Sequence, residues 1–445
     1  MSASTEPCRS SALESASAIR EQRLTSERLI HSCLAAIDAR ETELRAWASL
    51  DYGHALAQAR AADVAVRDGA HLGPLHGVPV GIKDIFDTTD FPTGWGFAPL
   101  KERAPNEDAA VVTRLREAGA VILGKTVTTE FASVTPSKTR NPHDRSLTPG
   151  GSSSGSAAAV AAHMAPLALG SQTGGSTIRP ASFCGVIGFK PSFGAISRHG
   201  CMMLSKPLGH VGLYARTVED IVVLASVLYG ADERDPVPHP IADISWAAFD
   251  AASTDLSPRF ALTRTPFWER ADAAVCDALE CWCETLGCSD ELQAPESFAQ
   301  GEAWSNTLFG YEFAHRFSGL ATRHGEQLSA INQTDIEAGA LLTAADYEHA
   351  RQGQTTLTKA VDALFDHTDV LVTLPAAGEA VSLDSTGDPI FCSVWTLSGN
   401  PAITLPLLTG PNGLPLGVQL IGRKNHDVQL LAIAASLMRP SGARG

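Results

Sequence analysis

The sequence predicts an α/β protein, built as one large domain around a mixed β-sheet with a helical insertion. Segments of helix and strand character alternate between residues 77 and 230, and strand character returns in three short runs after residue 368. The chain has 445 residues, of which 44% are hydrophobic and 19% are charged. A chain of this length and composition can bury one large core.

The first segment, residues 1–70, is expected to be helical and to pack on the core. Thr25-Ser26-Glu27 is typical of a helix N-terminus, and apolar residues follow it at helical spacing in RLIHSCLAAIDA. A second helix is predicted from about His54 to Arg67, and Gly69 ends it.

Segment 71–240 is expected to supply the centre of the domain. GVPVGIKD (77–84) and AVILGKT (120–126) have β character and enclose the helical run AAVVTRLREAG. The further elements predicted here are a helix of small residues at 155–165, strands at 165–172 and 186–191, and a helix at 217–230.

The remaining chain divides into a variable part, 241–365, and a C-terminal part, 366–445. Residues 231–255 are rich in Pro, Asp and Ala and are expected to form a connection. The variable part predicts one strand, RFALTRT, and then helices on the substrate side. The C-terminal part is predicted to complete the core with strands at 369–374, 402–408 and 417–422, a turn at Gly410-Pro411-Asn412-Gly413, and a helix from about Asp427 to Met438.

The charge and the hydropathy pattern exclude several classes of partner. The net charge is −15 at pH 7 and the isoelectric point is near 5.4, so the surface repels nucleic-acid backbones and anionic membranes. No run of about 18 apolar residues is present, and the N-terminal residues lack the apolar stretch of a secretory signal. A cytoplasmic protein with a small-molecule ligand is therefore expected.

Four of the nine cysteines, Cys276, Cys281, Cys283 and Cys288, lie close together in the sequence. Their spacing matches no zinc pattern, and the segment predicts an amphipathic helix. Packed or exposed thiols are favoured over a metal site.

Two short patterns resemble known catalytic loops without the setting that those loops need. GAVILGKT (119–126) satisfies the phosphate-binding pattern G-x4-G-K-[ST], but its inner residues are those of a buried strand and a helix precedes it. GSSSG (151–155) satisfies G-x-S-x-G with Ser153 as nucleophile, but a loop with a proline precedes it where a strand is required.

A third arrangement joins Lys83 to two loops rich in glycine and serine, 150–155 and 174–176. Lys83 lies between apolar runs, where desolvation lowers the pKa of a lysine and makes it usable as a base. A serine hydroxyl needs such a base to attack a carbonyl, and Ser176 follows two glycines just before a predicted helix start. Ser152 can relay the proton, and the N–H groups of the second loop can stabilise an oxyanion.

On spacing alone a second interpretation of these residues stays open. In it, Lys83 is paired with Asp84 or Asp87, which are close in sequence, and the two loops are structural turns.

Five blocks of the chain resemble the amidase signature family, in that family's order. They are GVPVGIKD (77–84), GKTVTTEFA (124–132), TPGGSSSGSAAAVAA (148–162), TGGSTIRPASFCGVIGFKPS (173–192) and GNPAITLPL…GLPLGVQLIG (399–422). The blocks together extend over most of 75–230 and 369–438. A resemblance of this extent outweighs the two shorter loop patterns.

The resemblance implies a mixed, largely eleven-stranded twisted sheet surrounded by helices. It also implies a Ser–cis-Ser–Lys triad, with Ser176 as nucleophile, Ser152 as the serine of a non-proline cis peptide bond, and Lys83 as base. Hydrolysis of a linear small-molecule amide, or of a urea-type C–N bond, would then proceed through an acyl-enzyme.

The same resemblance assigns the residues around the triad. The oxyanion hole would be formed by the backbone N–H groups of Thr173, Gly174, Gly175 and Ser176, and Ser153 would form hydrogen bonds behind the triad. No metal or organic cofactor is implied, and a homodimer would fit the family.

One departure from the common family pattern lies around the nucleophile. Many members carry an acidic residue before the GGS sequence, whereas this chain has Ser171-Gln172-Thr173, followed by Thr177-Ile178-Arg179-Pro180. The variant resembles the malonamidase branch, in which the arginine at this position grips a substrate carboxylate. Arg179 is therefore the candidate substrate-binding residue. Its alternative role is to brace Asp or Glu side chains in the core.

Two rival functions are weighed against a stand-alone amidase. The glutaminase subunit of a tRNA-dependent amidotransferase shares the fold but typically carries the acidic loop, so Gln172 argues against it. A catalytically inactive binding protein is disfavoured, because Lys83, Ser152 and Ser176 are all present.

The substrate pocket is predicted only in outline. The segment AWSNTLFGYEFAHRF (303–317) contains Trp304, Phe309, Tyr311 and Phe313, which could form an aromatic wall, although a helix packed on the core is favoured. Trp395 and Cys392 are further pocket candidates.

Overall fold

The computed structural model describes residues 6–237, 244–288 and 290–439. Its strands are β1 (Trp47–Leu50), β2 (Pro79–Lys83), β3 (Val121–Thr126), β4 (Leu167–Gln172), β5 (Ile187–Lys190), β6 (His210–Ala215), β7 (Phe260–Leu262), β8 (Asp290–Glu291), β9 (Val370–Thr373), β10 (Ala402–Thr409) and β11 (Pro415–Gly422). In the described residues they form one eleven-stranded sheet, in the order β1-β3-β2-β4-β6-β5-β10-β11-β9-β7-β8.

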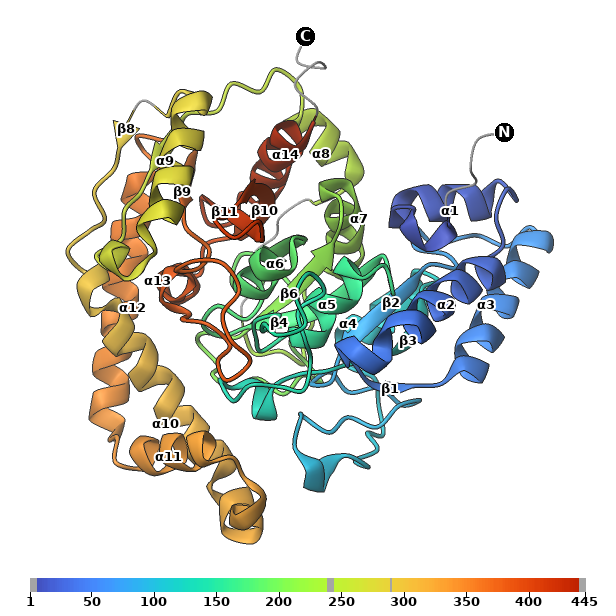
Figure 1. Cartoon of the computed structure of the whole chain (residues 1–445), viewed down its shortest axis with the longest axis horizontal. Helices are drawn as coiled ribbons and strands as arrows, with labels where there is room; N and C mark the ends of the chain where they lie inside the picture. Colours follow the sequence, from blue (N-terminus) through green and yellow to red (C-terminus); the bar gives the residue numbers. More distant parts are fainter. Residues whose placement is uncertain (1–5, 238–243, 289, 440–445) are drawn as a thin grey trace.

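Helices surround this sheet (Figure 1). They are α1 (Ala12–Arg20), α2 (Ser26–Leu44), α3 (Tyr52–Arg67), α4 (Ala110–Glu117), α5 (Ser154–Ala161), α6 (Ile178–Cys184), α7 (Val218–Leu228), α8 (Trp246–Ala252), α9 (Ala273–Leu286), α10 (Phe298–His324), α11 (Ala330–Ala340), α12 (Ala344–Leu364), α13 (Ile390–Ser398) and α14 (Asp427–Met438). The predicted α/β class with a mixed sheet is confirmed.

The strand directions bring distant segments to one edge of the sheet. β2 is parallel to both β3 and β4, whereas β4 and β6 are antiparallel. Because parallel neighbours end at the same edge, Lys83 at the end of β2 lies beside Ser171 near the end of β4. The glycine-rich loop 173–176 follows β4 directly, so it begins at this edge.

The sheet separates two helical layers. Leu213 and Ala215 of β6 pack in a cluster with α7 and α14, whereas Tyr214 between them packs with α5 and α6. This alternation is the period of two that a strand imposes on its side chains. The glycine, serine and alanine content of α5 is explained by its burial: a Cβ at Gly155 would lie only 2.1 Å from the Ala46 carbonyl oxygen.

The N-terminal segment is helical except for one edge strand. The predicted cap of α2 is confirmed, because the Thr25 Oγ1 accepts a hydrogen bond from the Arg28 N–H at 3.1 Å. Residues 47–50 form β1, which pairs with β3, so the expectation of a helical segment at 1–70 is wrong there. Trp47 is buried in the strand, and aromatic residues favour that conformation. Residues 1–5 lie outside the described residues.

The expected connection at 231–255 is also only partly correct. It contains α8, which packs against α14, and residues 238–243 lie outside the described residues. Further along the chain, β7 and β8 extend the main sheet, and the 27-residue helix α10 packs against α11, α12 and α13. Residues 440–445 of the C-terminal part are not described.

Two central elements, β6 and α13, have no predicted counterpart. The nine residues of α13 are all buried, so it lacks the polar face that reveals an amphipathic helix. β6 contains Gly212, where a Cβ would lie 2.0 Å from the Thr177 Oγ1, so close packing and not strand propensity selects this residue.

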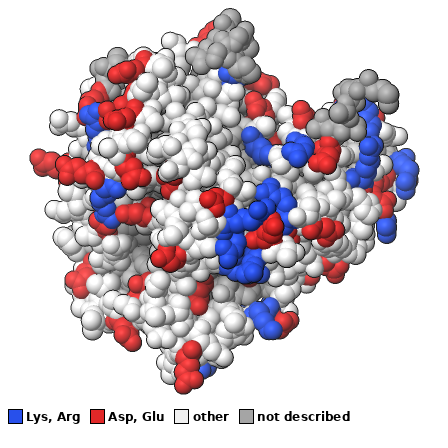
Figure 2. Space-filling view, in the orientation of Figure 1, with Lys and Arg blue, Asp and Glu red and all other residues white. Residues whose placement is uncertain are grey.

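Acidic side chains are spread widely over the face shown in Figure 2, and Lys and Arg side chains gather in fewer groups, one of them near the centre. This distribution accompanies the net charge of −15. In the described part of the chain, no helix is both long enough and apolar enough to cross a membrane.

Candidate active site

Lys83 is completely buried and its ammonium group contacts three serine hydroxyls. The Nζ atom lies 2.7 Å from the Ser152 Oγ, 3.0 Å from the Ser153 Oγ and 2.8 Å from the Ser171 Oγ. These three partners are neutral. The position of Lys83 follows from the parallel register of β2 on β4, in which Ile82 lies opposite Leu169, so that the Lys83 side chain reaches Ser171 near the end of β4. Ser171 is a partner that the sequence patterns did not reveal.

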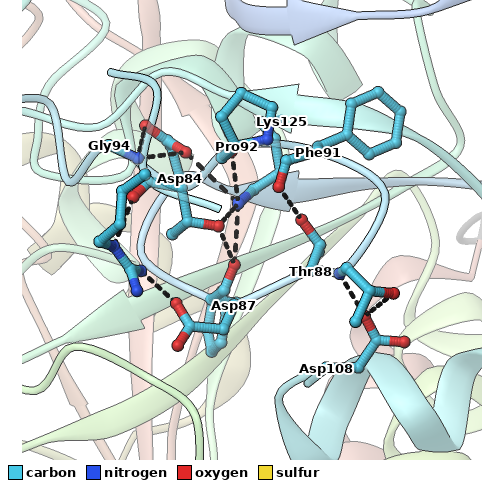
Figure 3. Close-up of polar contacts among 12 residues, drawn as sticks. Asp84, Asp87, Thr88, Phe91, Pro92, Gly94, Asp108 and Lys125 are labelled. Atoms are coloured by element: carbon cyan, nitrogen blue, oxygen red, sulfur yellow. Dashed lines mark hydrogen bonds and ion pairs between the residues drawn. The ribbon is translucent and has the colours of Figure 1, made fainter. Parts of the chain in front are cut away.

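The carboxylates next to Lys83 in the sequence are paired with other cations. Asp84 lies 3.3 Å from the Lys125 Nζ and accepts hydrogen bonds from the Gly94 N–H (Figure 3). Asp87 accepts a hydrogen bond from Arg103. The interpretation in which Asp84 or Asp87 pairs with Lys83 is therefore wrong.

Burial sets the protonation of this lysine. Burial removes water from the ammonium group and thereby lowers the pKa of Lys83 to about 7. No described carboxylate forms an ion pair with the ammonium group that would oppose this shift. Burial also lowers the pKa of Lys125, to about 8, where Asp84 opposes the shift. Lys83 can therefore exist as a neutral amine at neutral pH, as a general base must.

The phosphate-loop pattern that contains Lys125 does not form a phosphate-binding loop. The residues VILGKT form β3, a buried strand, where a phosphate loop would need a flexible loop. The Lys125 Nζ donates hydrogen bonds to the Thr93 Oγ1 at 2.6 Å and to the Phe86 carbonyl at 2.8 Å. Lys125 is thus an internal brace of the 84–93 loop.

The first glycine–serine loop contains a cis peptide bond between Gly151 and Ser152, at the position that the family resemblance implies. Ser153 is fully buried, and its Oγ accepts a hydrogen bond from the Ser171 N–H at 3.2 Å as well as from Lys83. Ser153 therefore braces the end of β4. A loop precedes it, so the nucleophile-elbow geometry is not formed.

The second loop is held in shape by Gln172. Its Oε1 accepts hydrogen bonds from the N–H groups of Thr177 and Ile178 at 2.8 and 3.0 Å. Its Nε2 donates to the Thr396 Oγ1 at 3.0 Å, and that hydroxyl donates to the Gly174 carbonyl at 2.6 Å. The neutral amide supplies both an acceptor and a donor, and a carboxylate would lack the donor. Thr396 is another residue that sequence reasoning missed.

The N–H groups of this loop are available to a ligand. Within the described residues, no protein group accepts a hydrogen bond from the backbone N–H of Gly174, Gly175 or Ser176. The loop 173–176 lines a cavity of about 510 Å³. Backbone N–H groups without a protein acceptor at the edge of a cavity are able to stabilise an oxyanion.

The cavity lies between the core and the helices α10 and α11. From the core it is lined by loop 173–176, Arg179 and residues 132–134, and from the helical side by Phe309 and Asp335 among others. Of the four aromatic residues proposed as a wall, only Phe309 lines this cavity. Trp304, Tyr311 and Phe313 do not line it: their rings lie against Gly353, Tyr347 and Phe317, respectively.

Cys392 and Trp395 lie behind the cavity. Both are fully buried in α13, and neither lines the cavity. The Cys392 Sγ lies 3.1 Å from the Pro375 carbonyl, and Trp395 packs edge-on against Phe298. Cys392 therefore packs behind Gly175, since a Cβ at that glycine would lie 3.2 Å from the Cys392 Cβ, whereas Trp395 belongs to the core next to α10.

Arg179 lines the cavity beside the loop that carries Ser176. Its Nε and Nη2 donate to the carbonyls of Thr386 and Gly151 at 2.6 and 2.7 Å. Its Nη1 has no hydrogen-bond partner in the described residues, and a Cβ at Gly175 would lie 2.6 Å from it. No described carboxylate forms an ion pair or a hydrogen bond with Arg179, so the alternative in which it braces core Asp or Glu residues is wrong.

The cysteine-rich helix α9 does not gather its thiols. Cys276 and Cys283 are buried, Cys281 is exposed, and Cys288 follows the helix. Among the residues that the structure describes, no group of three or more His, Cys, Asp or Glu side chains is arranged to hold a metal ion.

Known proteins resemble this chain over nearly its whole length. A sequence model of the family described as Amidase matches residues 28–431. The protein AmiD of Mycobacterium tuberculosis is 34% identical over 451 residues, which cover 96% of this chain and 94% of AmiD. A glutamyl-tRNA(Gln) amidotransferase subunit of Chloroflexus aggregans is 33% identical, over 95% of this chain and 94% of its own length.

The solved structures extend this likeness to the fold. A structure from a vestigial protein complex, described as revealing the evolutionary origins of an s-triazine catabolic enzyme, matches with a TM-score of 0.90. The two chains are 28% identical, and the match covers 96% of this chain and 98% of the other.

Proposed function

This chain belongs to the amidase signature family and is an amide-hydrolysing enzyme, and from that premise we propose that Ser176, Ser152 and Lys83 are its catalytic triad. The proposed reaction is hydrolysis of a linear small-molecule amide or urea-type C–N bond. The observation that carries the proposal is the buried Lys83, which contacts only neutral hydroxyls and adjoins the serine of the cis peptide bond.

The proposed proton path follows from the hydrogen bonds of Lys83. A neutral lysine amine has two N–H donors and one lone pair. If the two donors serve Ser153 and Ser171, the lone pair faces Ser152 and can accept its proton. Ser152 in turn accepts the proton of Ser176, which raises the nucleophilicity of that serine.

The bond changes then follow the usual course of acyl transfer. The Ser176 Oγ attacks the amide carbonyl, and the N–H groups of residues 173–176 stabilise the negative oxygen. The proton returns through Ser152 to the leaving nitrogen, and ammonia or an amine departs. Water then attacks the acyl-enzyme by the same relay, which releases the acid and restores Ser176.

A fluorophosphonate probe tests the assignment of the nucleophile. We expect the probe to label Ser176, because it reacts with serines that a neighbouring base activates. Proteolysis and mass spectrometry of the labelled protein would locate the modified residue. Labelling of Ser153 would contradict the proposal, and so would the absence of any label on folded protein.

We further propose that the substrate carries a carboxylate that binds Arg179. A buried guanidinium without an ionic partner is costly, and burial lowers the pKa of Arg179 for the same reason. Its Nη1 has no hydrogen-bond partner among the described residues, and Arg179 lines the cavity. A substrate carboxylate next to the scissile carbonyl would supply the missing partner.

Replacing Arg179 with Met should raise KM more for an acidic substrate than for a neutral one. We expect KM for a malonamate-like amide to rise at least about tenfold more than KM for the neutral amide of the same length, the typical loss for a charged hydrogen bond. In the variant, the Gly151 and Thr386 carbonyls lose the hydrogen bonds that Arg179 donates in the wild type. This effect is the same for both substrates, so it cancels in the ratio of the two KM changes. Equal changes in both KM values would contradict carboxylate binding.

The likeness to the amidotransferase subunit supports a second candidate function, a glutaminase that works with partner proteins. Gln172, which shapes the nucleophile loop through both ends of its amide, favours the stand-alone hydrolase over it. Glutamine-dependent ammonia release that requires a co-purified partner would favour the glutaminase.

A further inference from the structure

Asp335 is the one acidic side chain among the described residues that line the cavity. It lies on α11, and the cavity-facing residues of this region are Asp335, Ala338, Gly339 and Leu342. Their spacing of three, four and seven residues is that of one helix face. The other members of the face are apolar or lack a side chain, so a carboxylate interrupts a surface that would otherwise be apolar.

The Asp335 carboxylate has no partner in the described part of the chain. It takes part in no hydrogen bond or ion pair with a described residue, although it is partly buried. Burial raises the pKa of Asp335, and no neighbouring cation opposes this shift. An unpaired, partly buried carboxylate costs free energy, and a positive ligand would remove that cost.

The backbone under Asp335 is held in place by two contacts. α11 crosses α10 where Gly339 meets Gly310, and a Cβ at Gly339 would lie 2.1 Å from the Gly310 carbonyl oxygen. Glu130 of the core accepts hydrogen bonds from the Ser329 N–H at 3.1 Å and from the Asn332 Nδ2 at 2.7 Å, at the start of α11. Asp335 is therefore presented to the cavity by a fixed helix.

The cavity thus carries one charge of each sign on opposite walls. Arg179 belongs to α6 of the core and Asp335 belongs to α11 of the helical layer (Figure 1). Arg179 adjoins the loop that carries Ser176, whereas Asp335 belongs to the other wall. A volume of about 510 Å³ leaves room for an extended small molecule between them.

We propose that Asp335 binds a cationic nitrogen of the substrate, on the part of the molecule remote from the scissile amide. This inference rests on the proposed function for the position of the amide, and it narrows the substrate class to amides that carry an ammonium or similar cation. The carboxylate at Asp335 would then select such substrates over their neutral isosteres.

A binding experiment tests this without any knowledge of the natural substrate. Calorimetric titration compares n-pentylammonium with 1-pentanol, which is similar in size but neutral, on wild type, Asp335→Asn and Glu337→Gln. We expect the ratio of the two affinities to fall at least about tenfold in Asp335→Asn, as for the loss of a charged hydrogen bond. Glu337 is an exposed acid on the same helix that does not line the cavity, so Glu337→Gln should keep the wild-type ratio.

Protection of Ser176 from the fluorophosphonate probe places the cation in the cavity. In wild type, n-pentylammonium should slow labelling at a concentration at least about tenfold lower than in Asp335→Asn. Equal affinity ratios in wild type and Asp335→Asn would overturn the inference, as would an equal loss in Glu337→Gln.

The two proposals fail in different ways. If Ser176 is never labelled but Asp335→Asn still abolishes the preference for n-pentylammonium, the triad is wrong and the cation site stands. If Ser176 is labelled and the preference is unchanged, the triad stands and the cation site is wrong.

Discussion

Ser176→Ala is expected to lower the rate of amide hydrolysis by about 10⁴-fold or more, the order seen when a serine hydrolase loses its nucleophile. The alanine cannot form the acyl-enzyme, while loop 173–176 and the cavity keep their shape. Initial rates of amine or ammonia release, measured for both proteins on a panel of malonamate-like, ureido, aliphatic and aryl amides, would check this.

Ser226→Ala is the matched control for that experiment. Ser226 is an exposed residue of α7, in the helical layer on the other face of the sheet, so its loss should leave the rate unchanged. If Ser176→Ala kept more than about a tenth of the wild-type rate, the assignment of Ser176 would be contradicted. The loss of a nucleophile lowers the rate far more than about tenfold. A complete loss in Ser153→Ala with an active Ser176→Ala would restore the nucleophile-elbow interpretation.

Lys83→Met is expected to reduce kcat by at least about a thousandfold, because general base catalysis and activation of the nucleophile are lost together. The pH profile supplies the sharper measurement. Lys83 has to be neutral to accept a proton, so kcat/KM of the wild type should rise with pH and level off above about 7, the pKa to which burial lowers this group.

The residual activity of Lys83→Met should lack that inflection near neutral pH. Methionine has a similar length and no charge, so the variant avoids an empty cavity. Circular dichroism and thermal unfolding of the variant would establish that it is folded. A wild-type inflection that survives in Lys83→Met would show that another group titrates, and Lys83 would no longer be the base.

Local patterns in the sequence were sufficient for much of the fold. Alternating helix and strand segments predicted β2, β3, β4 and the helices between them, because hydrophobic period and capping act over neighbouring residues. These local patterns failed where complete burial removes the periodic alternation of apolar and polar residues. α13 is apolar on every side, and β6 carries a glycine for close packing, so neither element has a pattern of its own.

The candidate site shows the same division between local and distant information. The residues Lys83, Ser152 and Ser176 were identified from their blocks, and the structure brings Lys83 and Ser152 to 2.7 Å. Their ionic environment could not be predicted in this way. Asp84, adjacent to Lys83 in the chain, pairs with Lys125 of the neighbouring strand, and a non-local strand register decides that choice.

The fold class, the family and the residues of the proposed triad could be identified from the amino-acid sequence, because they depend on short runs of residues in a set order. Three features became visible only in the folded chain: Lys83 has no carboxylate partner among the described residues, Arg179 has no ionic partner there, and Asp335 lines the same cavity as Ser176. Electrostatic partners and cavity walls come from segments that are distant in the sequence, and only the folded chain brings those segments together.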